Sequence, residues 1–348
     1  MKTEIYKILD FNAPDKDIIE TSAKCIREGG LVVFPTETVY GLGADATNEV
    51  AVSSIFTAKG RPSDNPLIIH IADTKDADKY SHTSELYYKL AERFMPGPLT
   101  VIMRSRDIIP RKTRGGLDTV AVRCPESLIA RELIKAAGVP IAAPSANLSG
   151  TPSPTTADHV IHDMTGRVDI IIDGGSSDFG LESTIVKIED DETLTLLRPG
   201  KITVTELETV APVKIADAVT DMLKDGEVAL SPGMKYRHYA PKAPLILYDG
   251  DIVALAKYIE ASSGEKIAVI SYSEDCEKLA ELLPKAMLYS FGKKEDSISQ
   301  AHNLFSILRE ADACDYDEIY APLPDTQGVS LALYNRMIRA AAHKIIRL

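Results

Sequence analysis

The sequence predicts an α/β protein of two domains, the first built on a partly antiparallel sheet and the second on a smaller parallel, doubly wound sheet. Its 348 residues suit about two domains at roughly 150 residues each. Hydrophobic residues make up 45% and charged residues 26%, which is an ordinary globular balance. Short apolar runs and amphipathic stretches mix irregularly over the first 200 residues and alternate strictly after residue 244.

The first 200 residues carry helices and strands at uneven spacing. Apolar Ile18, Ile19, Ala23 and Ile26 repeat at helical spacing over 17–28, and Gly29-Gly30 then provides a stop. A polar, glycine-containing loop is expected after the strand at 31–34. Further helices are predicted over 49–58, 85–94 and 127–137, and further strands over 67–71, 99–103, 120–123, 139–144, 169–172, 183–188 and 194–197.

The residues after 244 have the pattern of a Rossmann-like domain. Apolar strands at 244–249, 266–271, 286–291 and 317–322 alternate with helical stretches near 251–262, 274–283, 295–311 and 329–345. We therefore predict a first domain over 1–210, a connecting segment over 211–243 and a second domain over 244–348. Within that segment, SPGMKYRHYAP at 231–241 reads as a linker by its prolines, while its aromatic residues predict that it docks on something.

The charge balance limits the classes of partner. Acidic residues outnumber basic ones 51 to 39, and the net charge of −12 argues against general adhesion to nucleic acid or anionic membrane. A basic window at 104–123 is the exception, and it reads either as a local polyanion contact or as a solvated loop. Without an apolar leader or an apolar stretch of about 18 residues, a cytoplasmic protein with no membrane contact is expected.

Known cofactor motifs are absent or out of context. Residues 41–46 fit G-x-G-x-x-A, but six residues separate the preceding strand from the first glycine, which argues against a dinucleotide site. The four cysteines form no C-x-x-C pair, and His159 with His162 is either half a metal site or a feature of a helix surface. We expect no NAD, flavin or zinc, and no dinucleotide in the second domain, whose role is structural or regulatory.

Six short polar segments at predicted strand ends stand out instead. They are 35–43, 59–70, 96–100, 143–150, 181–186 and 197–200. Loops at strand ends are where open α/β sheets usually bind ligands. Their arginines, lysine and small hydroxyl or amide side chains suit phosphate and carboxylate groups. Each segment alone could equally form turns and caps, but six together favour an anion site.

These segments resemble the YrdC family in its long two-domain form, the threonylcarbamoyl-adenylate synthases. The family's K-x-R and S-x-N signatures appear as Lys59-Gly60-Arg61 and Ser145-Ala146-Asn147. The stretches PTETVYGLG, NPLIIH, PGPLT, STIV and RPG match in order, and 231–241 resembles the interdomain linker. The resemblance is strong through residue 200 and implies a twisted mixed sheet with a concave ligand pocket.

The resemblance also implies a reaction. L-Threonine, bicarbonate and ATP would give L-threonylcarbamoyl-AMP and pyrophosphate, the first step of threonylcarbamoyladenosine formation in tRNA. Mg²⁺ is expected on the triphosphate, since metal ions commonly neutralise charge in phosphoryl chemistry. The expected partners are these small molecules, the downstream tRNA threonylcarbamoyl transferase machinery and a weak contact with tRNA.

The resemblance assigns residues to two substrates. Lys59 and Arg61 would be the catalytic pair, with Lys59 helping to neutralise phosphates. Ala143 would contribute only its backbone, Asn147 would chiefly support its loop, and Tyr236 would fold over the pocket and exclude water. The residues expected to bind ATP are Lys59, Arg61, Asn65, Thr119, Ala143, Ser145, Asn147, Ser153, Arg198 and Tyr236. The residues expected to bind threonine are Thr38, His70, Arg123 and Ser183.

Two other functions stay open at this point. An RNA-binding module of the same fold would use the basic window, although the overall charge opposes it. An adenylate-forming enzyme acting on another amine would use the same pocket.

Overall fold

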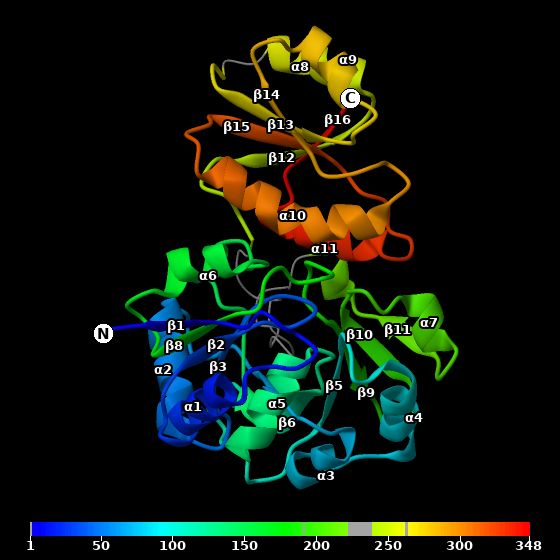
Figure 1. Ribbon diagram of the computed structural model, residues 1–348. Helices are drawn as coiled ribbons and strands as arrows, with labels where there is room; N and C mark the ends of the chain where they lie inside the picture. Colours follow the sequence, from blue (N-terminus) through cyan, green and yellow to red (C-terminus); the bar gives the residue numbers. More distant parts are fainter. Residues whose placement is uncertain (1, 191, 222–238, 262–263) are drawn as a thin grey trace. The chain divides into compact units, whose positions relative to one another are not determined.

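The computed structural model describes residues 2–190, 192–221, 239–261 and 264–348 (Figure 1). Contacts divide the chain into two compact units, residues 1–149 with 153–235 and residues 150–152 with 236–348. Strand β11 (Val213–Ile215) pairs in parallel with β10 (Leu194–Arg198). The first sheet therefore continues beyond residue 210, where the sequence predicted the connecting segment to begin.

The first unit is built on an eleven-stranded mixed sheet. Its order is β1-β8-β2-β3-β7-β4-β6-β5-β9-β10-β11, with both parallel and antiparallel neighbours, as predicted. The other strands are β1 (Glu4–Lys7), β2 (Val32–Phe34), β3 (Gly41–Asp45), β4 (Ile68–His70), β5 (Leu99–Arg104), β6 (Thr119–Arg123), β7 (Ile141–Ala142), β8 (Ile170–Asp173) and β9 (Thr184–Ile188). The helices are α1 (Lys16–Arg27), α2 (Glu49–Lys59), α3 (Ala77–Tyr80), α4 (Glu85–Phe94), α5 (Leu128–Ala137), α6 (Ala157–Met164) and α7 (Val204–Glu208).

Local signals place the ends of the helices. The Asp15 carboxylate accepts hydrogen bonds from the backbone N–H groups of Asp17 and Ile18, so α1 begins there. Its apolar face, predicted from periodicity, is buried in one core with α5, β2 and β8. Gly29 follows the helix with φ of +85°, a left-handed conformation that suits glycine.

Strand β3 is an element that the sequence did not predict, because its glycines read as a loop. A Cβ on Gly43 would lie 2.7 Å from Cε1 of Phe34 and 2.8 Å from Cγ2 of Ile141. Glycine is therefore required by the close approach of the neighbouring strands β2 and β7. Since residues 41–46 run along this strand and not from a strand into a helix, they do not form a dinucleotide-binding turn.

The second unit contains a five-stranded parallel sheet in the order β14-β13-β15-β12-β16. Figure 1 shows α8 and α9 on one face of it and α10 and α11 on the other, as expected for a doubly wound domain. The strands are β12 (Leu245–Asp249), β13 (Ile267–Ser271), β14 (Met287–Ser290), β15 (Glu318–Pro322) and β16 (Ile345–Arg347). The helices are α8 (Ile252–Glu260), α9 (Cys276–Leu282), α10 (Ser297–Asp312) and α11 (Ser330–Ala340).

The end of the chain differs from its predicted helix over 329–345. Helix α11 ends at Ala340, and Ala342 and His343 then adopt positive φ values of 48° and 61°. The chain turns there and adds β16 beside β12 as a fifth strand. Ile346 packs against the core of this unit, so burial at the sheet edge outweighs helical periodicity.

The linker is described only at its end. Tyr239 stacks on Phe305 of α10 with ring centroids 5.1 Å apart, and Cζ of Arg336 lies 5.8 Å from the Tyr239 ring centroid. An aromatic residue of the linker therefore docks on the second unit. Tyr236 lies outside the described residues, so its predicted role over the pocket stays a prediction.

Among the helices in the described parts of the chain, none is long and apolar enough to span a membrane.

Candidate active site

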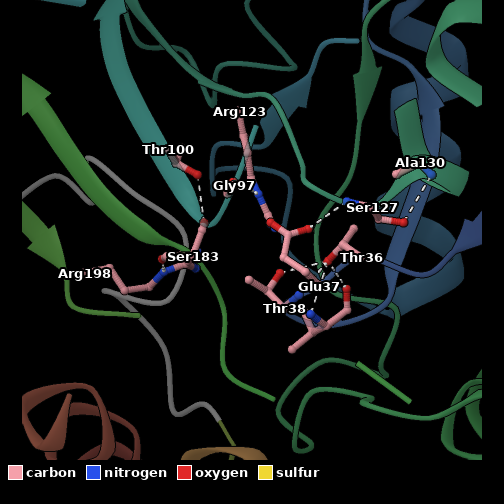
Figure 2. A network of polar contacts seen from close by, with 11 residues as sticks. Thr36, Glu37, Thr38, Gly97, Thr100, Arg123, Ser127, Ala130, Ser183 and Arg198 are labelled. Carbon is pink, nitrogen blue, oxygen red and sulfur yellow. Dashed lines mark hydrogen bonds and ion pairs between the residues drawn. The ribbon is translucent and has the colours of Figure 1, made fainter. Parts of the chain in front are cut away.

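Three adjacent strands line up polar side chains in one row across the first sheet. His70 at the end of β4 lies opposite Arg123 at the end of β6, and Thr100 of β5 lies opposite Arg123 on the other side. Directly opposed residues of paired strands project from the same face of a sheet. We call His70, Arg123 and Thr100 the three-strand row. Thr100 Oγ1 lies 2.8 Å from Ser183 Oγ, which attaches Ser183 to the row (Figure 2).

The loop between β2 and β3, which carries Thr38, contacts the row through Glu37. Thr36 Oγ1 lies 2.8 Å from Thr38 Oγ1 and donates to the Val39 carbonyl oxygen at 2.6 Å, which fixes the loop locally. Between them, Glu37 places Oε1 at 2.6 Å from Nη2 of Arg123 (Figure 2). The four residues predicted to bind threonine are thus gathered in one region.

The sequence reasoning missed Glu37. This glutamate lies in the polar segment 35–43, in which only Thr38 was predicted to bind a substrate. A signal was present, since an acidic residue inside an apolar, hydroxyl-rich segment needs a cationic partner when it is buried. Glu37 is 5% exposed.

His70 is electrically neutral in this site. Burial, reinforced by the positive charge of Arg123, lowers the pKa of His70 to about 3. Its Nδ1 is buried and has no hydrogen-bond partner within the described residues. An uncharged imidazole with an unused ring nitrogen is suited to a ligand hydroxyl.

Arg198 lies beside Ser183 and holds it in place. It is buried, at the end of β10, and its Nε donates to the Ser183 carbonyl oxygen at 3.0 Å while Nη2 donates to Ser183 Oγ at 3.1 Å. Arg198 thus fixes both the backbone and the hydroxyl of Ser183. This links a residue predicted to bind ATP with one predicted to bind threonine.

Asn65 carries an unusual buried carboxamide. It is 1% exposed, and neither Nδ2 nor Oδ1 has a hydrogen-bond partner in the described parts of the chain. A buried polar group left unpaired costs roughly 1–3 kcal/mol, so Asn65 calls for a partner outside the chain, either a ligand or an ordered water. Arg61 lies near it in sequence and donates from Nη2 to the Pro66 carbonyl oxygen at 3.5 Å.

Thr119 stands at the opposite end of β6 from Arg123. Four residues of a strand span about 13 Å, and the two side chains project from the same face. Ile68 of β4 lies opposite Ala121 in a parallel register, so the segment with Asn65, just before β4, runs beside the beginning of β6. Asn65 and Thr119 therefore lie at one end of the β4–β6 pair, and His70 and Arg123 lie at the other.

Lys59 anchors the S-x-N loop. Its ammonium is buried at the end of α2 and donates to the carbonyl oxygens of Ser145 and Asn147 at 2.5 and 2.6 Å, and to Asn147 Oδ1 at 3.3 Å. Ser145 Oγ donates to the same Oδ1 at 2.5 Å. The K-x-R and S-x-N signatures thus form one unit in space. Whether Lys59 also neutralises phosphate stays a prediction.

The remaining predicted residues have hydrogen-bond partners within the first unit. Ser153 is fully buried, and its Oγ donates to Glu182 Oε1 at 2.5 Å. The N–H of Ala143 donates to the Ile68 carbonyl oxygen, which leaves only its carbonyl for a ligand. Asn147 Nδ2 donates to the Leu148 carbonyl oxygen, so its contacts support the loop.

The described residues offer no cluster of metal ligands, and the cysteine beside Arg123 has a disfavoured thiolate. No group of three or more His, Cys, Asp or Glu side chains gathers there as a metal site. Cys124 follows Arg123, and burial raises the pKa of its thiol to about 11, which disfavours the reactive thiolate.

The basic window at 104–123 is not one patch, since Arg114 and Arg123 are buried while Arg104 and Arg106 are exposed.

Comparisons with known proteins find relatives that match both parts of the chain. The family model described as "Telomere recombination" matches residues 24–200, and the model described as "Threonylcarbamoyl-AMP synthase, C-terminal domain" matches residues 202–342. The chain is 44% identical to the threonylcarbamoyl-AMP synthase of Pyrococcus abyssi, over 94% of this chain and 95% of that protein. It is 43% identical to the threonylcarbamoyl-AMP synthase of Bacillus subtilis, over 94% of each.

A solved structure matches both units. The crystal structure of P. abyssi Sua5 complexed with L-threonine superposes with a TM-score of 0.90 at 41% identity, covering 99% of this chain and 100% of that chain. The chain therefore belongs to the family of Sua5, YciO and YrdC proteins, in its two-domain form. The resemblance found in the sequence motifs is confirmed, and the relatives named here are enzymes.

Proposed function

We propose that this protein makes L-threonylcarbamoyl-AMP from L-threonine, bicarbonate and ATP, releasing pyrophosphate, as the first step of threonylcarbamoyladenosine formation in tRNA. The observation that carries the proposal is the three-strand row. It aligns a buried arginine with a neutral histidine; the Ser183 hydroxyl joins it through Thr100, and the loop that carries Thr38 joins it through the Glu37–Arg123 ion pair. These groups match the carboxylate, hydroxyl and amine of threonine.

The chemistry requires little from a protein nucleophile. The uncharged threonine amine and bicarbonate condense to a carbamate with loss of water. A carbamate oxygen then attacks the α-phosphate of ATP, and the bond to the pyrophosphate leaving group breaks. Positioning and charge neutralisation dominate such a transfer.

The ATP-binding part of the proposal rests on Asn65, Arg61, Thr119 and Arg198. The unpartnered carboxamide of Asn65 suits a nucleotide that accepts from Nδ2 and donates to Oδ1. Arg61 and Arg198 suit phosphate oxygens. Since the described residues offer no carboxylate cluster for a metal, we expect Mg²⁺ to be bound by the triphosphate itself.

We place this activity in the cytoplasm, upstream of a transferase that moves the threonylcarbamoyl group to tRNA. A labile mixed anhydride must reach that transferase before water hydrolyses it. A weak contact with tRNA is part of this proposal.

The test measures pyrophosphate release from ATP and Mg²⁺, with threonine and bicarbonate omitted in turn. We expect release only with both, and its loss in Lys59→Ala and Arg61→Ala. Release with serine or glycine in place of threonine would point to another amine. No release in any mixture, with salt-sensitive tRNA binding, would favour an RNA-binding module instead.

A further inference from the structure

Glu37 and Arg123 form a buried ion pair at the centre of the candidate threonine site. Their side chains are 4% and 5% exposed, and Oε1 of Glu37 lies 2.6 Å from Nη2 of Arg123. Bringing both charges out of water costs several kcal/mol per ion, so the pair is not explained by stability alone. The negative charge of Glu37 also weakens the attraction of Arg123 for an anionic ligand. The geometry of the Arg123 guanidinium gives a reason for Glu37 to lie beside it.

The guanidinium of Arg123 is held along one edge. Nε donates to the Gly97 carbonyl oxygen at 3.4 Å, and Nη2 donates to Glu37 Oε1 at 2.6 Å. Nε and Nη2 share one side of the planar group. In the described residues Nη1 makes no hydrogen bond. The outer end of the fork, Nη1 with the second hydrogen of Nη2, therefore stays available for a carboxylate.

Glu37 is itself fixed from two directions. Its Oε2 accepts from the backbone N–H of Ser127 at 3.4 Å, at the start of α5 (Figure 2). Helix α5 has no acidic residue in its own first turn, so Glu37 supplies the negative charge that a helix N-terminus favours. Its backbone carbonyl oxygen accepts from Phe179 N–H at 2.9 Å. A side chain held at both oxygens cannot rotate freely, and Arg123 is oriented in turn.

We propose that Glu37 is a positioning residue for the substrate carboxylate, acting through Arg123. It fixes the guanidinium so that the two donors at its outer end meet both oxygens of the amino-acid carboxylate. This inference rests on the proposed function, since it deepens the role of Arg123 in threonine binding. Nothing in it requires Glu37 to touch substrate.

The test compares threonine with L-threoninamide, in which a neutral amide replaces the carboxylate. Calorimetric titration of the full chain gives both affinities. We expect the unsubstituted protein to bind threonine at least tenfold more tightly than threoninamide. In Glu37→Gln we expect that ratio to fall below threefold, with threoninamide affinity within twofold. Glutamine replaces one of the two accepting oxygens by an NH2 group, which only donates, so the contact with Arg123 or the one with Ser127 N–H is lost.

A helix-cap variant provides the matched control. Ser84→Ala removes the cap of α4, where Ser84 Oγ accepts from Tyr87 N–H at 3.3 Å, and it lowers stability modestly. It leaves Arg123 untouched, so the ratio should not change. If Glu37→Gln does not fold, Glu37→Asp keeps the charge but shortens the reach and should also lower the ratio.

The outcomes separate the two proposals. An unchanged ratio in the folded Glu37 variants, or an equal loss for both ligands, overturns the positioning role. Failure of the unsubstituted protein to bind threonine overturns the proposed function instead. A lowered ratio in the Glu37 variants alone supports the inference.

Discussion

At the scale of single residues, two buried cations at this site are satisfied in different ways. Lys59 donates to backbone carbonyl and amide oxygens of the S-x-N loop, and it therefore holds a loop in place. Arg123 faces a carboxylate and keeps part of its fork for a ligand. A compact ammonium suits the first task and a planar guanidinium the second.

Replacing Lys59 by methionine tests its role. Lys59→Met keeps the length of the side chain and removes its donors, so Ser145 and Asn147 lose their anchor. We expect affinity for ATP and for adenosine to fall by similar factors, of about tenfold, in titrations of each ligand. A loss confined to ATP would show that phosphate neutralisation dominates. Lys135→Met, on the exposed side of α5, should change neither affinity.

The neutral state of His70 makes stability depend on pH. The pKa of His70 is about 3 in the folded chain, because of burial and Arg123, and about 6.5 when unfolded. Between these values only the unfolded chain binds the proton, so the free energy of unfolding falls as the pH drops from 6.5 towards 3, by on the order of 1 kcal/mol per unit.

Urea denaturation between pH 5 and pH 8 measures this slope. His70→Gln should lose the part of the slope below pH 6.5, whereas His82→Gln, at an exposed site, should keep it. An identical slope in His70→Gln would contradict the neutral buried state.

At the scale of elements, close packing decides where glycine is needed. Strand β3 lies between β2 and β7 in the order of the sheet, and its two glycines are packed with different closeness. A Cβ on Gly43 would come within 3 Å of Phe34 and Ile141, whereas on Gly41 it would meet Cβ of Ala143 at 3.2 Å. The strand can therefore tolerate a methyl group at one position better than at the other.

Alanine substitution in β3 checks this difference. Gly43→Ala should lower the free energy of unfolding by roughly 1–3 kcal/mol through overpacking. Gly41→Ala should cost less, since its nearest contact, Cβ of Ala143 at 3.2 Å, has to give by only a few tenths of an ångström. Chemical denaturation of both variants gives the comparison. Equal losses would mean that backbone freedom, and not packing, explains the glycines.

At the scale of the whole molecule, each unit has its own hydrophobic core. The first includes a core around α1 and α5, and the second one around α8 and β13. Each core is formed by residues of one unit. Such units can unfold in separate transitions.

A core substitution in the second unit tests this independence. Leu255 of α8 is fully buried, so Leu255→Ala should destabilise its unit by about 2–5 kcal/mol. In scanning calorimetry, the midpoint temperature of the second unit's transition should fall, and that of the first unit's transition should stay unchanged. Saturating threonine should raise only the midpoint temperature of the first unit, which carries the candidate threonine site, because a ligand stabilises the state that binds it. A joint shift of both transitions would show that the units unfold together.

The sequence by itself determined the class of the fold and supplied the candidate site residues. Helical periodicity with capping residues located α1 and α5, and strict alternation of elements predicted the parallel sheet of the second unit. The resemblance carried by its signature segments named Arg123, His70 and Ser183 as candidates. These are local patterns, and the local pattern of a sequence survives in its structure because helices and strands have fixed periods.

The tertiary structure decided which distant segments meet. Strand β3 and strand β16 exist because neighbouring strands pair with them, although glycine content and periodicity indicated otherwise. The pairing of Glu37 with Arg123, 86 positions apart, and the anchoring of residues 145–147 by Lys59 depend on the order of strands in the sheet. Burial makes a charge find a partner, but only the folded chain determines which partner lies within reach.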